Sequence, residues 1–306
     1  MPNVVVAIPT FRRPAGLARL LAALEKLETS AKMIVVVADN DAGKHEGYDL
    51  CRSLCAQYRW PLDPVIAEER GIAQVRNTLV ARALSYPEAG FVAMLDDDEW
   101  PSPQWLDELL AVQAATKADV VEGSILFEGE GAPWAGGFDG LSSMRRPSGP
   151  IAMLEGAGNL LITRRCLEGL AAPWFDPAFA LSGGEDRDFF ERVKGAGGHF
   201  AWSDEGLAHT VVPERRRSLD WVLRRAFGIG NTEMRIFLKR HPGRAARLAE
   251  YAKIASALLL TPLLALILAV APNRAADALR RFCRNAGKLA ALLGLRYNAY
   301  AVTHGE

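Results

Sequence analysis

Short apolar runs alternate with amphipathic segments along the first hundred residues. Apolar runs occupy positions 4–8, 33–38 and 91–95. Between them, apolar residues recur every three or four positions, as in helices, over 17–27, 47–58 and 72–84. Runs that are apolar at every position are typical of strands covered by helices on both faces. This order predicts an α/β fold with a mostly parallel central sheet flanked by helices and right-handed crossovers.

The same pattern continues to about residue 212. It predicts helices over 103–116 and 186–194, and strands over 120–127, 159–163 and 208–212. The segment 129–158 is rich in Gly, Pro and Ser, so we expect a loop there, which would lie over the binding site described below.

Beyond Pro213 the chain changes character, which divides it into an α/β domain (1–212) and a basic helical region (213–306). An apolar segment, 254–271, carries no charged residue and has Pro262 near its middle. An amphipathic basic helix is expected after it. The apolar segment is just long enough to cross a bilayer of about 30 Å. It could instead lie on a membrane surface, pack as a buried helix or form a dimer interface.

Charge and cysteine usage narrow the class of protein. The net charge is zero, but residues 1–212 carry −11 and residues 213–306 carry +11. The basic region therefore suits an anionic membrane surface, whereas the acidic domain suits a cation. Four cysteines without a CxxC pair favour a reducing compartment, and we see no secretory signal. The composition excludes a disordered chain and a disulfide-rich miniprotein.

Polar residues follow each of the first three predicted strands. Thr10–Arg12 follows the first, Asp39–Asn40 the second and Asp96–Asp98 the third. In open α/β sheets, ligands bind in the crevice beyond the carboxyl ends of the strands. The three clusters therefore predict one binding site. No GxGxxG motif follows the first strand, so a standard dinucleotide fingerprint is absent from the sequence.

The aspartate triplet is the first candidate for chemistry. At the end of a strand, its first and third carboxylates can face the same way and share one ion. Oxygen ligands of this kind suit Mg²⁺ or Mn²⁺, which commonly share their coordination shell with substrate phosphates. A solvated acidic turn is the alternative interpretation of the triplet.

Four further residues have both a functional and a structural interpretation. Glu185 and Asp186 follow two glycines and begin a helix, where a carboxylate can act as a general base or simply cap the helix. Arg76 can pair with a phosphate or lie on the surface of its helix. His209 is a candidate metal ligand at the end of its strand, although a lone histidine more often has a structural role.

Taken together, these segments resemble the family 2 glycosyltransferases, which have the GT-A fold. The resemblance covers about residues 4–212, and within the family it is nearest to the enzymes of bacterial exopolysaccharide assembly. The matching segments, in the order of the family, are VAIPTFRRP at 6–14, VVVADNDA at 35–42, ERGIAQVRNTLVARA at 69–83, LDDDEWP at 95–101, GAGNLLITR at 156–164 and GGEDRDFFERV at 183–193.

The resemblance implies roles for individual residues. It implies a nucleotide-binding set, with Asp39 at the base and Asp97 at the ribose, comprising Pro9, Thr10, Arg12, Asp39, Arg76, Asp96 and Asp97. It places a divalent metal on Asp96 and Asp98, with His209 as a further ligand. It makes Asp186 the general base of an inverting enzyme, and Glu185 a neighbour that holds the acceptor hydroxyl.

The implied function is metal-dependent transfer of a sugar from a nucleotide-sugar, expected to be a UDP-sugar, to a hydroxyl of a glycan or lipid-linked acceptor. The sequence has Asn40 where many members have a second Asp, and it lacks the QxxRW motif of processive synthases. We therefore expect single additions of sugar. We expect the enzyme at the cytoplasmic face of a bacterial inner membrane, with no nucleic-acid partner. A metal-dependent nucleotidyltransferase and a non-catalytic membrane scaffold are the alternatives.

Overall fold

The computed structural model describes residues 3–128, 143, 145–268 and 271–299. Its strands are β1 (Asn3–Thr10), β2 (Lys32–Asp39), β3 (Leu62–Ile66), β4 (Phe91–Leu95), β5 (Glu99–Pro101), β6 (Val120–Glu128), β7 (Gly149–Ile151), β8 (Asn159–Thr163) and β9 (Phe200–Val211). Its α-helices are α1 (Pro14–Leu24), α2 (Glu46–Leu54), α3 (Ile72–Leu84), α4 (Trp105–Thr116), α5 (Arg164–Glu168), α6 (Glu185–Gly195), α7 (Leu219–Lys239), α8 (Arg244–Ile267) and α9 (Pro272–Leu292). Two short 3₁₀ helices are η1 (Pro177–Phe179) and η2 (Glu214–Arg217).

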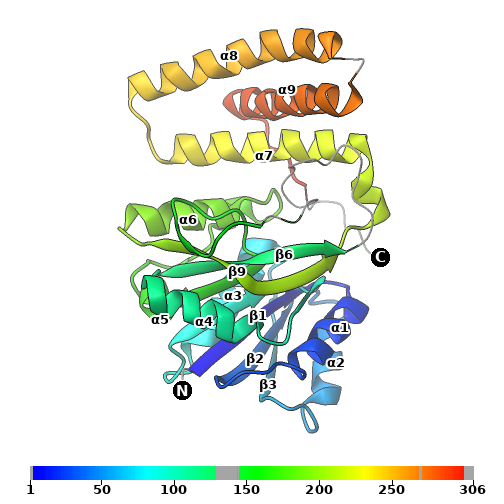
Figure 1. Cartoon of the computed structure of the whole chain (residues 1–306), viewed down its shortest axis with the longest axis vertical. Helices are drawn as coiled ribbons and strands as arrows, with labels where there is room; N and C mark the ends of the chain where they lie inside the picture. Colours follow the sequence, from blue (N-terminus) through cyan, green and yellow to red (C-terminus); the bar gives the residue numbers. More distant parts are fainter. Residues whose placement is uncertain (1–2, 129–142, 144, 269–270, 300–306) are drawn as a thin grey trace.

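The strands form one mixed sheet in the order β3-β2-β1-β4-β8-β6-β9-β5, with β7 paired to β9 (Figure 1). The first four strands are parallel, and for β1, β2 and β4 this confirms the prediction from the sequence pattern. β8 is antiparallel to both β4 and β6, β9 is parallel to β6, and β5 and β7 are antiparallel to β9. The parallel arrangement therefore holds for one half of the sheet, and the other half is mixed.

Side-chain alternation along β1 divides the core between the two faces of the sheet. Val4, Val6 and Ile8 pack with the leucines of α1 on one face. Val5 and Ala7 pack on the other face with residues of α3 and α6. Because every position of β1 after Asn3 is buried, its sequence is apolar throughout until Thr10 at the carboxyl end.

Several expected elements differ in extent, and some elements were not expected. The sequence pattern missed β3, an edge strand whose residues are all half-buried and which contains Pro64. Proline is tolerated on such an edge because one side of the strand needs no ladder hydrogen bond. β9 extends to twelve residues, well beyond the expected 208–212. Much of the expected loop 129–158 lies outside the described residues, and Gly149–Ile151 within it pairs with β9 as β7.

The chain beyond β9 is helical and forms a separate layer. Figure 1 shows α7 next to α6, α9 beside α7, and α8 as the outermost helix. α7 and α9 approach closely at two glycines, because a side chain on Gly230 would overlap the backbone of Arg284 and one on Gly287 would overlap the backbone of Phe227. α8 begins ten residues before the predicted apolar segment and continues as helix through Pro262.

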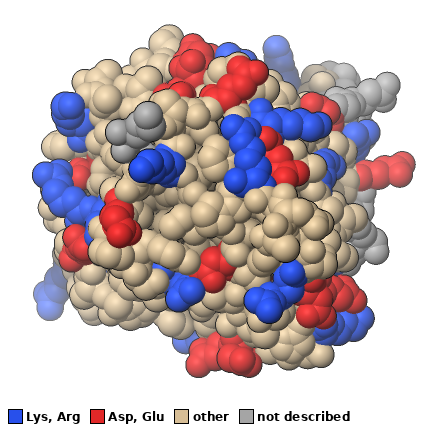
Figure 2. Space-filling view, turned by 90° about the horizontal axis from the view of Figure 1, so that it is seen from below, with Lys and Arg blue, Asp and Glu red and all other residues tan. Residues whose placement is uncertain are grey.

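The end of the molecule opposite α8 has an ordinary charged surface. Figure 2 shows this face with lysine and arginine interspersed among aspartate and glutamate. α8 is very different. Of the described residues, it is the helix long and apolar enough to cross a membrane, and only 17% of its most apolar window is buried. The excess of basic residues after position 213 therefore adjoins an exposed apolar helix.

Candidate nucleotide and acceptor site

The carboxyl ends of β1 and β4 are joined by the middle aspartate of the triplet. The Thr10 hydroxyl donates to Asp97 Oδ2 at 2.9 Å, and the backbone N–H of Phe11 donates to the same oxygen at 3.3 Å. Arg13 donates to Asp97 Oδ1 at 3.1 Å and to Asp98 Oδ2 at 2.9 Å. Burial raises the pKa of Asp97 to about 6, although the nearby Arg13 opposes the shift.

Asp97 therefore points into the protein and its neighbours do not. The Asp97 side chain is 8% exposed, whereas those of Asp96 and Asp98 are 35% and 32% exposed. The first and third carboxylates are thus more accessible to solvent than the middle one, and their sharing of one ion stays a prediction. Both oxygens of Asp97 contact groups that hold the ends of β1 and β4 together, and its assignment to the ribose of a nucleotide stays a prediction.

Arg76 brings the triplet together with the segment that begins α6. Its guanidinium lies 3.1 Å from Asp96 Oδ1 through Nη2 and 3.1 Å from Glu185 Oε1 through Nη1. The arginine is 4% exposed and its ion pair with Glu185 is buried, whereas Asp96 pairs with it from a side chain that is 35% exposed. The aspartate triplet and the Glu185–Asp186 pair, which are ninety residues apart in the sequence, therefore belong to one site. Arg76 itself holds the two halves of this site together.

The Glu185–Asp186 pair is presented by a turn that only glycine adopts easily. Gly183 and Gly184 have φ values of 75° and 88°, in the left-handed region. Glu185 is buried, and its second carboxylate oxygen, Oε2, has no hydrogen-bond partner among the described residues. Asp186 is half-buried and accepts a hydrogen bond from the N–H of Arg187 at 2.7 Å. The buried member thus faces Arg76, and solvent reaches Asp186.

The site holds more carboxyl groups than cations among the described residues. Burial, followed by the charge of Asp186, raises the pKa of Glu185 to about 7. Burial also raises the pKa of Asp96, which Arg76 opposes, and that of Glu99 well above its ordinary range. The positive charges of Arg13 and Arg76 offset only part of the repulsion among these carboxyl groups. An additional cation near the exposed carboxylates of Asp96 and Asp98 would reduce this repulsion further.

A divalent cation fits this chemistry when substrate phosphates complete its shell. Across residues 3–128, 143, 145–268 and 271–299, no three Asp, Glu, His or Cys side chains gather to hold a metal ion by themselves. Mg²⁺, however, is commonly bound through one or two carboxylates together with phosphate oxygens and water. Asp96 and Asp98, each about one third exposed, provide carboxylates of that kind.

His209 is held by contacts with neighbouring side chains. Its Nε2 lies 2.9 Å from the Ser102 hydroxyl, and its Nδ1 lies 3.1 Å from Glu128 Oε1. The ring also stacks on Trp100, with centroids 5.8 Å apart. Protein groups contact both ring nitrogens, and the role of His209 as a metal ligand stays a prediction. The neighbouring Thr210 hydroxyl donates to the Asp98 backbone carbonyl at 3.1 Å and so fixes the turn after the triplet.

Asp39 also turns inward. It is 1% exposed, and it accepts backbone hydrogen bonds from Asp41 at 2.9 Å, Gly47 at 2.8 Å and Tyr48 at 2.9 Å. These bonds hold the loop after β2 and the first turn of α2. These contacts show that Asp39 positions the loop, and its assignment to the base of a nucleotide stays a prediction.

The remaining residues of the predicted nucleotide set lie at the same edge of the sheet. Pro9 is buried within β1 opposite Ala38 of β2. Arg12, which has a left-handed φ of 55°, pairs through Nε with Asp41 Oδ2 at 2.6 Å. Arg12 thus stands beside the end of β2, and its prediction as a nucleotide ligand stays a prediction.

Several residues outside the predicted nucleotide-binding and metal-binding sets also build this edge. Arg13 neutralises two members of the triplet, and Glu99 adds a buried carboxyl group behind it. Asn40 joins β2 to the following loop by donating to the carbonyls of Ala67 and Glu69 at 3.0 and 2.7 Å. Arg13 and Glu99 are next in sequence to Arg12 and Asp98, which the sequence does place in the site. This adjacency is a signal by which both residues could have been predicted.

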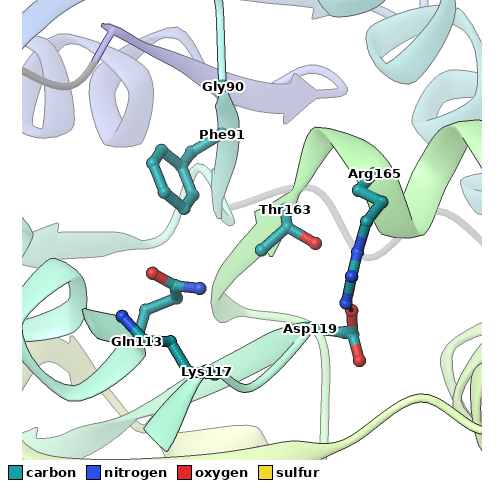
Figure 3. A pocket seen from close by; sticks show the side chains of 7 residues that line it. All are labelled: Gly90, Phe91, Gln113, Lys117, Asp119, Thr163 and Arg165. Atoms are coloured by element: carbon teal, nitrogen blue, oxygen red, sulfur yellow. Dashed lines mark hydrogen bonds and ion pairs between the residues drawn. The ribbon is translucent and has the colours of Figure 1, made fainter. Parts of the chain in front are cut away.

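Two cavities lie apart from the carboxylate cluster. One, of about 290 Å³, is at the opposite end of β4, where Phe91 pairs with Thr163 (Figure 3). Arg165 lines one side of it and pairs with Asp119 at 2.9 Å. The other, of about 380 Å³, lies beside α3 and includes Asn77 and Pro177. Neither includes a member of the aspartate triplet or of the Glu185–Asp186 pair.

Comparison with known proteins agrees with this architecture. A sequence model of the family described as Glycosyl transferase family 2 matches residues 5–143. The succinoglycan biosynthesis protein ExoM of Rhizobium meliloti (strain 1021) is 34% identical over 252 residues, which cover 79% of each chain. The pre-mycofactocin glycosyltransferase of Mycobacterium tuberculosis (strain ATCC 25618 / H37Rv) is 27% identical over 255 residues, which cover 80% of this chain and 50% of that protein.

Solved structures share the fold at low sequence identity. S. aureus TarS 1–349 in complex with UDP-GlcNAc matches with a TM-score of 0.51 and 17% identity, over 100% of this chain and 95% of that one. A longer TarS structure matches with a TM-score of 0.53 and 16% identity, and this chain spans 55% of its length. The mixed sheet with an acidic cluster at its strand ends therefore defines an enzyme of the GT-A fold. The chain belongs to glycosyl transferase family 2 and is a glycosyltransferase.

Proposed function

We propose that this enzyme is an inverting, metal-dependent glycosyltransferase. It moves a sugar from a nucleotide-sugar to a hydroxyl of a glycan or lipid-linked acceptor in the synthesis of a polysaccharide or glycolipid. The observation that supports this most directly is the bridge through Arg76, which ties the triplet to the Glu185–Asp186 segment. A donor held by the triplet would then face a carboxylate suited to activate the acceptor.

The proton transfer is assigned to Asp186. Asp186 is half-buried and in contact with solvent, so an acceptor hydroxyl can reach it, whereas Glu185 is held by Arg76. In the reaction, the hydroxyl oxygen forms a bond to the anomeric carbon as its proton passes to Asp186. The bond from that carbon to the phosphate oxygen breaks, and the electron pair leaves with the nucleoside diphosphate. Attack from the side opposite the leaving group inverts the anomeric configuration.

Asp96 and Asp98 are the residues that would hold a divalent cation. Their carboxylates are the two exposed ones of the triplet, and the repulsion between these neighbouring negative charges favours a cation. Bound Mg²⁺ or Mn²⁺ would neutralise charge on the leaving diphosphate. Arg13, which touches both Asp97 and Asp98, fixes the direction of this turn.

The donor is proposed to carry uridine diphosphate (UDP), and the product to be a bacterial exopolysaccharide. TarS with the same fold has been solved in complex with UDP and with UDP-GlcNAc. The relative that is 34% identical is a succinoglycan biosynthesis protein. The sequence lacks the QxxRW motif, which supports single additions of sugar.

The outermost helix is proposed to bind the surface of an anionic membrane, which would place the enzyme at the cytoplasmic face of a bacterial inner membrane. Nearly every strongly exposed large apolar side chain of the described residues lies on α8, on α9 or just after it: Leu248, Tyr251, Leu259, Leu260, Leu263, Leu264, Leu266, Ile267, Leu289, Leu293 and Leu295. An apolar patch of this size is costly in water. The basic residues around it would add attraction to anionic lipid.

Sedimentation with vesicles tests the membrane proposal. The purified protein should sediment with vesicles that contain phosphatidylglycerol, and a variant with Leu259, Leu263 and Leu266 changed to serine should stay largely in the supernatant. These side chains are 71%, 59% and 75% exposed, so the changes should leave folding intact. Equal sedimentation of the two proteins would contradict a role for this face.

Release of UDP tests the catalytic proposal. UDP-glucose, UDP-galactose and UDP-N-acetylglucosamine are incubated with the enzyme and Mn²⁺, with water or an added glycoside as acceptor. We expect release of free UDP from at least one donor, and loss of that release with excess chelator or in Asp96→Asn and Asp98→Asn. Release of pyrophosphate in place of UDP would instead indicate a nucleotidyltransferase, and full turnover in chelator would contradict the role of the metal.

A further inference from the structure

Helix α7, which belongs to the C-terminal helical layer, contacts the turn that presents Glu185 and Asp186. Figure 1 shows α7 running alongside α6. The Thr232 methyl group fills the space beside Gly184, so that any side chain at Gly184 would overlap it. The Thr232 hydroxyl also lies 3.4 Å from the Gly183 carbonyl. The lack of a side chain at Gly184 therefore lets α7 pack closely against the turn, in addition to allowing the backbone conformation of the turn itself.

One turn along α7, Arg235 holds the loop before those glycines. Its guanidinium donates to the Ser182 hydroxyl at 2.8 Å and to the Ala178 carbonyl at 2.5 Å. It also lies over the ring of Phe179, 4.7 Å from the ring centroid. Phe179 and Ser182 are buried, so this cation reaches from α7 into the base of the loop.

Another turn along, Lys239 holds the first turn of α6. Its ammonium group lies 2.7 and 2.8 Å from the two oxygens of Asp188 and 2.7 Å from Asp176 Oδ2. The Asp188 side chain is 4% exposed, and that of Asp176 is 25% exposed. Asp188 comes two residues after Asp186, and Asp176 precedes η1. Lys239 thus neutralises both ends of the segment that carries the acidic pair.

We propose that Arg235 and Lys239 are positioning residues that hold segment 176–188 so that Asp186 faces the acceptor. This inference rests on the proposed role of Asp186 as general base. Thr232, Arg235 and Lys239 lie at successive turns of one face of α7, and all three contact this segment and not the aspartate triplet. Loss of either cation should therefore impair the chemical step and leave donor binding unchanged.

The test uses the full-length chain and water as the acceptor. UDP release is followed for the UDP-sugar that the wild-type enzyme hydrolyses fastest among UDP-glucose, UDP-galactose and UDP-N-acetylglucosamine. The variants are Lys239→Met, Lys239→Arg, Arg235→Met and Arg235→Lys. Arg224→Met is the matched control, because Arg224 is on the same helix in an exposed ion pair with Asp220. Thermal unfolding and amide hydrogen exchange over 183–188 are measured for each protein.

We expect kcat to fall about tenfold or more in Lys239→Met and Arg235→Met, since small misplacements of catalytic groups cost rate on this scale. The KM for the UDP-sugar and the Kd for UDP should stay within about twofold of wild type. Amide exchange over 183–188 should become faster. Lys239→Arg should recover much of the lost rate, because it keeps the charge between the two aspartates, and Arg224→Met should behave as wild type.

Two results would overturn the inference. One is an unchanged kcat in folded Lys239→Met and Arg235→Met, and the other is a loss of UDP affinity equal to the loss of rate, which indicates general disruption. If Lys239→Met does not fold, Arg235→Met decides between these outcomes. A wild-type enzyme that neither binds UDP nor releases it would overturn the proposed function itself, a result that the UDP-binding arm distinguishes from a failed positioning role.

Discussion

Arg76 offers the most informative single perturbation of the site. In Arg76→Met the hydrocarbon stem remains, but the cation that bridges Asp96 and Glu185 is lost. Both carboxyl groups then lack a partner in a site where burial has already raised their pKa values, that of Glu185 to about 7. Arg76→Lys keeps a charge, but a single ammonium group does not reproduce the planar fork that reaches both carboxylates.

The stability that Arg76→Met should lose can be worked out from its two ion pairs. A pair of unit charges about 4 Å apart at an effective dielectric constant of about 20 interacts by about 4 kcal/mol. Removing one partner of a buried ion pair costs about 3–5 kcal/mol, because the other charge is left in the interior. Arg82→Met is the matched control on the same helix, since Arg82 pairs with Asp63 at a site where its side chain is 44% exposed. An exposed pair of that kind contributes about 0–1 kcal/mol.

The free energy of unfolding of the wild type and of Arg76→Met is measured at about pH 5 and about pH 8. Glu185 has a folded-state pKa raised from 4.5 to about 7, so its contribution to stability is present at low pH and lost as the pH rises through 7. Without the positive charge of Arg76, the pKa of Glu185 rises further, and the stability lost with rising pH becomes larger. We therefore expect Arg76→Met to lower the free energy of unfolding by about 3–5 kcal/mol at pH 8 and by much less at about pH 5. An equal loss at both pH values would refute the bridging role.

Three further predictions concern single groups. Asp186→Asn should lower kcat for UDP release by about 10²–10⁴-fold while the Kd for UDP, measured by calorimetry, stays within about twofold, as expected for loss of a general base. Burial raises the pKa of Glu122 from 4.5 to about 8, so the wild-type protein should lose stability as the pH rises through 8, and Glu122→Gln should flatten that dependence in urea titrations at pH 5 and pH 9. A steeper dependence in the variant would argue against the buried carboxyl group. Gly184→Ala, at a φ of 88° and against Thr232, should lower the melting temperature and the rate of UDP release, whereas Gly195→Ala, at the open far end of the same helix, should change neither.

The parallel half of the fold could be predicted because its signal is local. β1, β2 and β4 are buried on both faces, so each is a continuous apolar run that ends at a polar residue. β3 has no such signal, because it lies at the edge and is half-buried throughout. The mixed half depends on pairings such as β4 with β8, which join segments about seventy residues apart. No periodicity within a segment indicates such a partner or its direction.

The site was predictable in its location and less so in its contacts. The carboxyl ends of parallel strands meet at one edge, and this places Thr10 and the triplet together. Which aspartate points inward depends on Arg13 and on the turn after β4, and the sequence motif treats the three alike. The partnership of Arg76 with Glu185 requires α3 and α6 to be packed on the same face of the sheet, which only the folded chain reveals.

A crystal structure of the enzyme with UDP and Mn²⁺ would show both ligands at once, since manganese is located by its anomalous scattering. We expect the manganese peak in contact with Asp96 and Asp98, and the diphosphate on the side that faces Asp186. A peak elsewhere, such as the cavity between Phe91 and Arg165, or a diphosphate shielded from Asp186 by the protein, would contradict this expectation.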